Sequence, residues 1–337
     1  MDLLVLGGTL FLGRHVVADA LARGHKVSTF TRGRTDPDLF PEAEALHGDR
    51  DGDLTALGDR DWDAVIDTSG YVPRVVAESA HVLAGHIGHY TFVSSISVYA
   101  DHSTPGQDES APVEPLADPA SEDVEVDYGP LKAACEAAVD TCFAGQSCHV
   151  RAGLIVGPWD RSGRFTWWPT RVLRSGSMLA PIAPELAIQC IDVRDLAGWM
   201  LDGAEGGRTG TFNATSPPGA HTLGEVIDHS IEAAGTRPDV VWVDQQFLTD
   251  QCVQPWMELP LWVPSDGEFA GFASYDTSAA AAAGLALRPM AETVADTLAW
   301  AVEVGDEVAV PPTVGLEPTR EQDLIAAWRG TTRGMIQ

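Results

Sequence analysis

The feature that most constrains the fold is a glycine-rich turn that joins a buried strand to a helix near the amino terminus. Residues Leu3 to Leu6 form a continuous apolar run, typical of a parallel strand buried on both faces, and Gly7 and Gly8 follow directly. From Gly13 onwards apolar residues recur at helical spacing, and Gly24 stands where a glycine would close the helix. Backbone N–H groups at such a helix start can receive a phosphate, so the turn predicts a nucleotide site, with a merely tight turn as the alternative.

Further short apolar runs alternate with helical segments after this turn. Strands are predicted at 27–30, 64–66, 90–93 and 149–151, and helices at 75–87 and 128–143. Strands that alternate with helices at this spacing form right-handed βαβ units. The sequence therefore predicts an α/β fold with a doubly wound parallel sheet.

The chain length of 337 residues allows one large or two modest domains. The segment from Asp101 to Asp127 contains no Lys or Arg and many acidic residues, which predicts a long loop. After Pro158 tryptophans and prolines become frequent and the periodic segments become shorter. We therefore expect a dinucleotide-binding domain over 1–158, to which segments around 187–215 return, and a smaller C-terminal lobe for the substrate over 159–337.

The charge balance excludes several functions. Asp and Glu number 49 against 21 Lys and Arg, a formal charge of −28, which disfavours binding to nucleic acid or to an anionic membrane. No apolar run approaches the ~20 residues that span a bilayer, and we expect a cytoplasmic protein. The five cysteines form no Cys-x-x-Cys pair, and the histidine pairs lack a third ligand, so we expect reduced thiols and no metal site.

A tyrosine and a lysine stand four residues apart in Tyr128-Gly129-Pro130-Leu131-Lys132. This spacing places the phenol of Tyr128 and the ammonium of Lys132 on one face of a helix that begins there. A phenol has a pKa near 10, so a neighbouring cation that stabilises the phenolate makes it a usable acid or base at neutral pH. The alternative is a surface tyrosine beside a solvated lysine.

Taken together, these motifs resemble the extended short-chain dehydrogenase/reductases, the epimerase/dehydratase branch of that superfamily. The matching segments occur in the family's order along most of the chain: the glycine turn, Val93 to Tyr99 (VSSISVY), Tyr128 to Lys132, Arg151 to Pro158, Asp192 to Asp195 and Gly210 to Asn213. The resemblance implies a Rossmann fold and a catalytic set of Ser95, Tyr128 and Lys132. Tyr128 would move a proton at a carbonyl or carbinol oxygen, Lys132 would hold the nicotinamide ribose, and Ser95 would orient the substrate oxygen.

The resemblance also implies the residues that bind a nicotinamide dinucleotide. They are Gly7, Thr9, Leu10, Phe11, Leu12, Gly13, Arg32, Arg34, Asp49, Thr68, Ser69, Gly70, Tyr128 and Lys132. Leu10 stands where the family pattern usually has its middle glycine, and Asp67 replaces a more familiar residue before the turn at 68–70. NAD-specific relatives carry Asp near the position of Thr31. Here Arg32 and Arg34 follow instead, which favours NADP over NAD because guanidinium groups suit a 2′-phosphate.

The substrate end is predicted from fewer residues. We expect contacts from Ser97, Leu154, Trp159, Trp167 and Trp168, with filling of the small lobe as the alternative role of the tryptophans. Leu154 stands where nucleotide-sugar relatives usually carry an Asn that contacts the diphosphate. A neutral, partly apolar carbonyl compound is therefore the expected substrate, although Arg161, Arg164 and Arg171 could reach a phosphate.

Three functions follow from the sequence. The leading one is an NADP(H)-dependent oxidoreductase that acts on a carbonyl or alcohol through Ser95, Tyr128 and Lys132. The alternative is a nucleotide-sugar epimerase or dehydratase that keeps NAD bound. A non-catalytic nucleotide-sensing or RNA-binding relative is the third, and the complete catalytic set argues against it. The resemblance also implies a homodimer through the helices at 75–87 and 128–143.

Overall fold

Seven parallel strands form the main sheet, in the order β11-β6-β5-β4-β1-β2-β3. The structure is a computed structural model that describes the backbone of residues 1–334 and their side chains except at 306, 307 and 332–334. The strands are β1 Asp2–Leu6, β2 Lys26–Thr31, β3 Glu44–His47, β4 Trp62–Asp67, β5 Ile87–Ser95, β6 Ser147–Ala152 and β11 Gly210–Ala214. The chain runs outwards from β1 in both directions, which opens a crevice at the carboxyl ends of β1 and β4. The predicted doubly wound α/β fold is confirmed.

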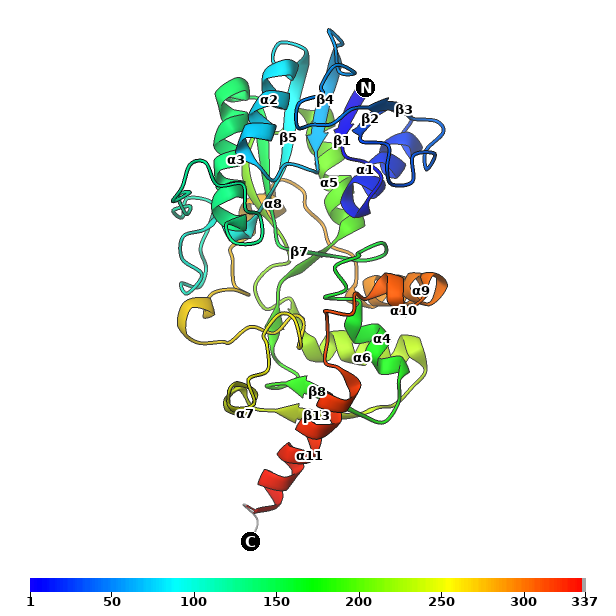
Figure 1. The fold of residues 1–337 in the computed structure, drawn as a ribbon, viewed down its shortest axis with the longest axis vertical. Helices are drawn as coiled ribbons and strands as arrows, with labels where there is room; N and C mark the ends of the chain where they lie inside the picture. Colours follow the sequence, from blue (N-terminus) through cyan, green and yellow to red (C-terminus); the bar gives the residue numbers. More distant parts are fainter. Residues whose placement is uncertain (335–337) are drawn as a thin grey trace.

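Helices cover both faces of this sheet, as Figure 1 shows. Side chains of β1 alternate between them: Leu3 and Val5 pack towards α1 and α5, and Leu4 and Leu6 pack towards α2 and α3. All four side chains are fully buried, which explains why the strand reads as a continuous apolar run. The helices are α1 Phe11–Ala22, α5 Val193–Gly206, α2 Pro73–Leu83 and α3 Tyr128–Phe143.

The predicted helix at 75–87 is wrong at both ends. Helix α2 begins at Pro73, which suits a first helical position because proline fixes φ and needs no N–H partner there. The helix ends at Leu83, and Gly85 turns the chain with a φ of +83° before Ile87 opens β5. Val76 and Leu83 are buried in the core of this chain, so these two side chains do not form the dimer surface that the sequence left open.

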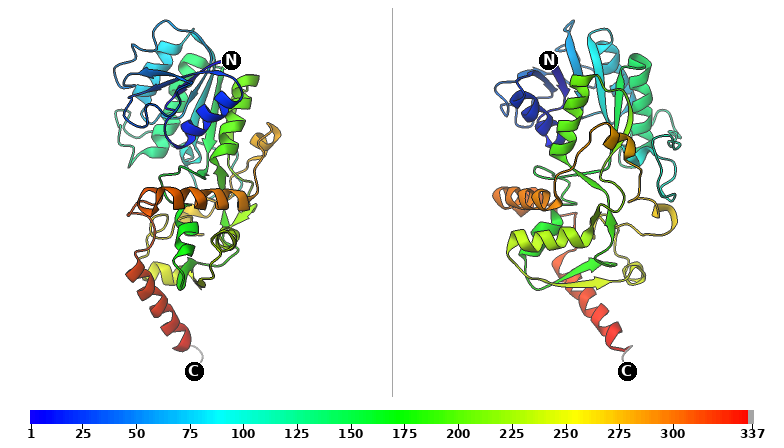
Figure 2. Two further views of the ribbon diagram at one scale, coloured as in Figure 1. Left: turned by 90° about the vertical axis from the view of Figure 1, so that its right-hand side faces the viewer. Right: turned by 180° about the vertical axis from the view of Figure 1, so that it is seen from behind.

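The C-terminal lobe has a core of its own, built mainly from residues after 154. Two parallel strands and several helices surround this core, and two short strand pairs lie in the same half of the chain. The elements are β7 Leu154–Val156, α4 Trp167–Leu173, β8 Ser177–Pro181, β9 Ala187–Ile188, β10 Cys190–Asp192, β12 His221–Thr222, α6 Leu223–Ala234, β13 Asp239–Val243, α7 Gln245–Asp250, α9 Met290–Val304, α10 Asp306–Ala309 and α11 Pro318–Gly334. Figures 1 and 2 show α11 leading away from the main sheet, so the two termini lie at opposite ends of the molecule.

Two later segments pack against the first lobe. Strand β11 joins the edge of the main sheet beside β6, and α5 packs on α1. Helix α8 (Ser278–Ala282) contacts β11, and Ala280 is buried in the same core as α1 and α5. The sequence expected a return only around 187–215. The boundary proposed at residue 158 stays a prediction.

Three features bear on the classes of protein considered above. No helix within residues 1–334 is long and apolar enough to cross a membrane. All five cysteines are free. Among the residues that the structure describes, no group of three His, Cys, Asp or Glu side chains is arranged to hold a metal ion.

Candidate active site

In the glycine-rich turn between β1 and α1, the backbone at the start of α1 lies close to the backbone of the turn itself. Gly7 and Gly8 have φ of +106° and +112°, a region that side chains disfavour. A Cβ on Gly13 would lie 2.6 Å from the backbone nitrogen of Gly8, so only glycine fits there. No side chain caps the first N–H groups of α1. This cradle of free N–H groups fits the pyrophosphate of a dinucleotide.

Leu10 takes the place of the family's middle glycine without strain. It precedes α1 with an extended backbone (φ −119°, ψ 145°), and its side chain is 49% exposed. Since no positive φ is required at this position, a leucine is tolerated there. Its side chain points into open space beside the turn and lines the cavity described next.

A cavity of about 570 Å³ lies at the carboxyl ends of the strands, over this turn. Of the residues that the sequence assigned to the cofactor, the following line it: Gly7, Thr9, Leu10, Phe11, Leu12, Gly13, Arg32, Arg34, Asp49, Thr68, Ser69, Tyr128 and Lys132. Gly70 does not line it. A Cβ on Gly70 would lie 2.5 Å from the ring of Phe92, so this glycine is required by packing, and it acts through its carbonyl oxygen.

Arg32 and Arg34 lie on the exposed rim of this cavity, just beyond β2. Neither guanidinium lies within 4.0 Å of an acidic group in the part of the chain that the structure describes, although acidic residues far outnumber basic ones. The two cations are therefore available to an anion at this end of the cavity.

The three predicted catalytic residues come from adjacent elements. Ser95 ends β5, Tyr128 is the first residue of α3, and Lys132 lies one helical turn later. All three side chains line the first cavity, and Ser95 and Tyr128 also line a second, larger one. The Ser95 hydroxyl donates to the Ser97 Oγ and accepts from the Ser97 N–H, both at 3.1 Å. Ser95 and Tyr128 therefore form a wall between two spaces, where one can hold a cofactor and the other a substrate.

Lys132 is held almost out of contact with solvent. Its side chain is buried, and its Nζ donates to the carbonyl oxygens of Gly70 at 2.5 Å and Val93 at 2.6 Å. The ammonium also lies 4.3 Å from the ring centre of Phe92. Burial lowers the pKa of Lys132 to about 8. Two of its three N–H donors are committed to the protein, so one remains for a group in the cavity.

The phenol of Tyr128 responds to opposing influences. Burial raises its pKa above the usual value of about 10, while the Ser95 hydroxyl and the Arg164 guanidinium lower it. The side chain is nevertheless 36% exposed and faces both cavities. It can thus reach a substrate oxygen and exchange a proton with it.

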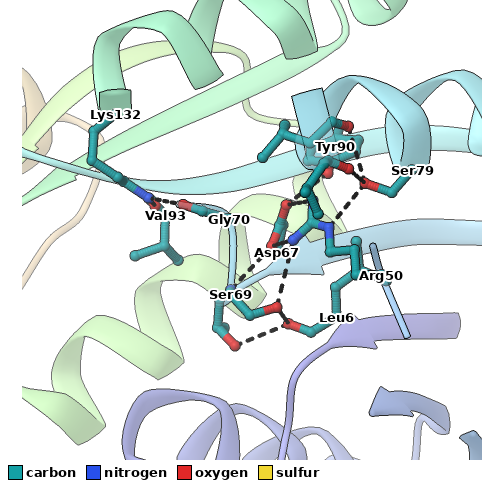
Figure 3. Close-up of polar contacts among 12 residues, drawn as sticks. Leu6, Arg50, Asp67, Ser69, Gly70, Ser79, Tyr90, Val93 and Lys132 are labelled. Atoms are coloured by element: carbon teal, nitrogen blue, oxygen red, sulfur yellow. Dashed lines mark hydrogen bonds and ion pairs between the residues drawn. The ribbon is translucent and has the colours of Figure 1, made fainter. Parts of the chain in front are cut away.

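A buried ion pair, which the sequence did not predict, lies beside the turn that holds Lys132 in place. Asp67, at the end of β4, is fully buried and accepts two hydrogen bonds from the guanidinium of Arg50. Its carboxylate also accepts from the Tyr90 hydroxyl at 2.8 Å and the Ser69 N–H at 3.0 Å. Arg50 holds the pKa of Asp67 below its usual range, against the effect of burial. Figure 3 shows these contacts beside Gly70 and Lys132.

The ion pair explains why an acid replaces the usual residue at position 67. Its bond to Ser69 fixes the turn after β4, and the next residue of that turn, Gly70, supplies a carbonyl to Lys132. Arg50 itself lines the first cavity. The ion pair therefore connects the first cavity to Lys132 through the turn that contains Ser69 and Gly70. A sequence signal existed in the Arg next to Asp49, but its partner could not be chosen among 49 acids.

The second cavity, of about 1180 Å³, lies between the sheet and the C-terminal lobe. Ser97 and Leu154, two of the residues that the sequence assigned to the substrate, line it. Its wall is largely apolar and aromatic, and it includes side chains that the sequence did not assign to the site: Tyr71, Met257, Leu261, Val263, Phe269 and Phe272. Tyr71 also lines the first cavity. This composition suits a ligand with a substantial apolar surface.

The three tryptophans proposed for the substrate do not line this cavity, so that prediction is wrong. Trp167 and Trp168 are buried in the core of the C-terminal lobe, and the Trp168 indole donates to the Pro260 carbonyl at 3.0 Å. Trp159 packs under the guanidinium of Arg14 and beside Trp300. A different tryptophan, Trp256, lines the cavity. The positions of these tryptophans in the sequence do not show which indoles are buried in the core and which line the cavity.

The acidic segment at 101–127, predicted as a long loop, lies mostly away from the second cavity. Its first half packs against the segment around 271–276, through bonds such as Gly271 N–H to the His102 carbonyl at 2.8 Å. Near its end, Val124 and Glu125 reach the second cavity, and Glu125 is the acidic residue of this loop that lines it. Most of the loop's negative charge therefore lies away from the cavity.

Solved structures share this fold. The Bordetella bronchiseptica enzyme WbmH in complex with NAD+ matches with a TM-score of 0.66 at 18% identity, over 90% of this chain and 99% of that one. A putative epimerase from Burkholderia cenocepacia J2315 matches with a TM-score of 0.67 at 20% identity, over 90% and 97%. UDP-glucuronic acid 4-epimerase from Bacillus cereus in complex with NAD matches with a TM-score of 0.68 at 12% identity, over 93% and 100%.

These likenesses define the class of fold. No family model and no curated protein sequence matches the chain. At 12–20% identity the structural matches show a shared fold over nearly the whole length of each chain. The observed fold is therefore the Rossmann-type α/β fold that the sequence resemblance implied. The chain shares this fold with the three solved structures.

Proposed function

We propose that this protein is a nicotinamide-dependent oxidoreductase that acts on an alcohol or carbonyl carbon of a substrate in the second cavity. The observation that carries this proposal is the shared wall: Ser95 and Tyr128 face both the cavity with the glycine cradle and the larger apolar one. The narrow approach at Gly7, Gly8 and Gly13 fits a dinucleotide. When bound there, a nicotinamide supplies the chemistry of hydride transfer.

The chain's own residues supply proton transfer and orientation. Tyr128 gives a proton to a carbonyl oxygen or takes one from a hydroxyl. The Ser95 hydroxyl, which donates to the Ser97 Oγ in this structure, turns to donate its hydrogen bond to the same substrate oxygen. Lys132 stabilises the phenolate through its positive charge, and its remaining N–H is available to a cofactor ribose. The two carbonyls that hold Lys132 fix the position of this charge.

Of the two forms that this chemistry can take, we place the epimerase cycle first. In that cycle a nicotinamide held by the glycine cradle would be retained, and it would supply the chemistry for removing a hydride from one substrate carbon and returning it to the other face of that carbon. The comparisons support this form: two of the neighbours above are described as epimerases or putative epimerases, and two as complexes with NAD. A cavity of about 1180 Å³ has room for a sugar to turn.

The second candidate is net oxidation or reduction with NADP(H). It is favoured by Arg32 and Arg34, which have no acidic partner at the rim of the first cavity, and by the apolar lining around Leu154. A bound 2′-phosphate would accept hydrogen bonds from these guanidiniums. A neutral, partly apolar carbonyl compound fits this form better than a nucleotide sugar.

Identification of the cofactor and of its fate tests both forms. The purified protein is denatured, and the released nucleotide is identified as NAD, NADP or neither. The protein is then incubated with candidate sugars or carbonyl compounds, while reduced cofactor is followed by absorbance and products by chromatography. Retained NAD with sugar isomerisation and no net reduced cofactor supports the epimerase. Consumption of NADPH in proportion to product supports the second candidate.

The result that contradicts both candidates is equally clear. A protein that binds no nicotinamide dinucleotide in a direct titration is neither enzyme, and a nucleotide-sensing or RNA-binding role would then be tested by RNA binding. The charge of −28 argues against RNA. Cytoplasmic location and a homodimer remain predictions from the sequence.

A further inference from the structure

Arg164 is a cation inside the second cavity without an ionic partner. It lies in the segment between β7 and α4, and it lines the cavity together with Trp256. Its guanidinium lies 5.6 Å from the centre of the Trp256 ring. The Nε atom is buried and makes no hydrogen bond, and within the described residues no acidic oxygen lies within 4.0 Å of the side chain. A buried donor with no acceptor is costly unless a ligand supplies one.

Three well-buried guanidiniums in this protein pair with acids: Arg50 with Asp67, Arg151 with Glu136, and Arg171 with Glu321. Two half-buried arginines without an acid within 4.0 Å, among the described residues, have other partners. The Arg14 guanidinium lies over the Trp159 ring, and Arg208 donates to two carbonyl oxygens. The half-buried Arg164 guanidinium faces the cavity and is available to a ligand there.

The structure also separates Arg164 from the two other arginines that the sequence offered as phosphate ligands. Arg171 is committed to a buried ion pair with Glu321 on α11, and also donates to the Ser177 carbonyl at 2.7 Å. Arg161 is exposed and does not line the second cavity. Arg164 is the member of this group that faces the site.

Two acidic side chains also line the cavity, and neither binds Arg164 within ion-pair distance. Both carboxylate oxygens of Asp160 already accept hydrogen bonds from Ser162, from its N–H at 2.8 Å and from its hydroxyl at 2.9 Å. Glu125 is exposed, on the acidic loop. The positive charge of Arg164 is felt at Tyr128, because it lowers the pKa of that phenol. An anion held by Arg164 would therefore lie near the reacting end of the cavity.

We infer that Arg164 binds an oxyanion of the substrate, a carboxylate or a phosphate, while the rest of the substrate lies against Trp256, Phe269 and Phe272. This inference rests on the proposed function, since it assigns the second cavity to the substrate of the same reaction. It replaces the neutral carbonyl compound expected from the sequence with an anionic one. A guanidinium donates two parallel hydrogen bonds to either oxyanion, which makes it the appropriate group for this role.

Matched pairs of small probes test the inference and distinguish the two sources of the oxyanion. 3-Phenylpropionate is compared with its neutral amide, and phenyl phosphate with phenol, by calorimetric titration of the cofactor-loaded protein. We expect at least one anion to bind about tenfold or more tightly than its neutral partner. A preference for the carboxylate indicates an acid substrate, and a preference for the phosphate indicates a phosphorylated one.

Three variants complete the experiment. Arg164→Gln is expected to bring the anion's affinity down to that of the neutral probe, and Arg164→Lys is expected to keep part of the preference. Arg161→Gln is the matched control, because it removes an exposed positive charge nearby, and it should leave the preference unchanged. Added sodium chloride should weaken the preference in the unmutated protein, which provides a measurement that does not depend on a variant folding.

Several results would overturn the inference. Equal or tighter binding of both neutral probes to the unmutated protein would do so, as would an anion preference that survives in Arg164→Gln. Failure of the proposed function looks different. If the protein binds anions through Arg164 but transfers no hydride, the oxyanion site stands and the proposed enzymatic function is rejected. If the protein turns over a neutral substrate, and this activity needs Tyr128 but not Arg164, the enzymatic function stands and the oxyanion site is rejected.

Discussion

Replacing Asp67 by alanine should strongly destabilise the protein. The carboxylate is fully buried and accepts hydrogen bonds from Arg50, from the Tyr90 hydroxyl and from the Ser69 N–H. Its loss leaves the Arg50 guanidinium, whose side chain is 10% exposed, without a counter-charge. Breaking a buried pair from one side costs about 3–5 kcal/mol. Since domains are stable by about 5–15 kcal/mol, Asp67→Ala should remove about a fifth or more of the stability.

The matched control is an exposed ion pair on β3, an edge strand of the same sheet. Glu44 binds Arg60 with both partners more than a third exposed, so Glu44→Ala should cost about 0–1 kcal/mol. Urea unfolding followed by tryptophan fluorescence gives both values, and the double variant Arg50→Met with Asp67→Leu should recover most of the loss. A cost for Asp67→Ala no larger than that for Glu44→Ala would refute the argument from burial.

The same pair predicts how stability depends on pH. Burial raises the pKa of Asp67 in the folded protein, but Arg50 and the hydrogen bonds from Ser69 and Tyr90 together lower it by more, so the net pKa lies below that of the unfolded chain. The folded state therefore favours the ionised carboxylate more strongly than the unfolded state does. Its contribution is therefore fully present above the unfolded pKa of about 4 and is lost as the pH falls through the lower folded value. In Asp67→Ala the acid limb of the stability curve should be flatter. Parallel curves for the variant and the unmutated protein would argue against this assignment.

The other predictions concern catalysis, cofactor and assembly. Tyr128→Phe should lower turnover by about 100-fold or more with nearly unchanged cofactor affinity, and equal turnover would reject the acid-base role. The second candidate requires NADPH to bind more tightly than NADH. Arg32→Ala should then reduce the difference more than Arg34→Ala, at ~1.5–3 kcal/mol for each contact. Equal affinities in a titration of the unmutated protein would reject this candidate and leave the NAD-retaining epimerase. The pKa of Lys132 lies at about 8, so its positive charge is lost as the pH rises through that value, and turnover should fall there. Lys132→Arg should move this fall in turnover to higher pH. An unshifted pH profile would reject the role of the Lys132 charge in turnover. Light scattering should return a dimer mass at micromolar concentration, and a monomer mass would exclude the homodimer.

Local patterns in the sequence determined much of the first lobe, and in the site they determined the glycine-rich turn and the pair Tyr128 and Lys132. The turn from β1 into α1 is specified within a dozen residues, and the helix from Tyr128 to Phe143 was predicted with the bounds that the structure has. Tyr128 and Lys132 share a helix face because four residues make about one turn. These features depend on backbone geometry and short-range periodicity, which are readable along the chain.

Only the tertiary structure decided which charges find partners. Arg50 forms an ion pair with Asp67 across 17 residues, and Arg171 with Glu321 across 150. Arg164 forms no ion pair among the described residues and faces the cavity. Two of these three arginines are thus neutralised within the protein and the third is not, because the outcome depends on which segments pack together. The same holds for Trp168, which the packing of α4 against the rest of the lobe buries. Sequence patterns identify which residues can carry chemistry, and long-range packing decides whether a protein group or a ligand neutralises them.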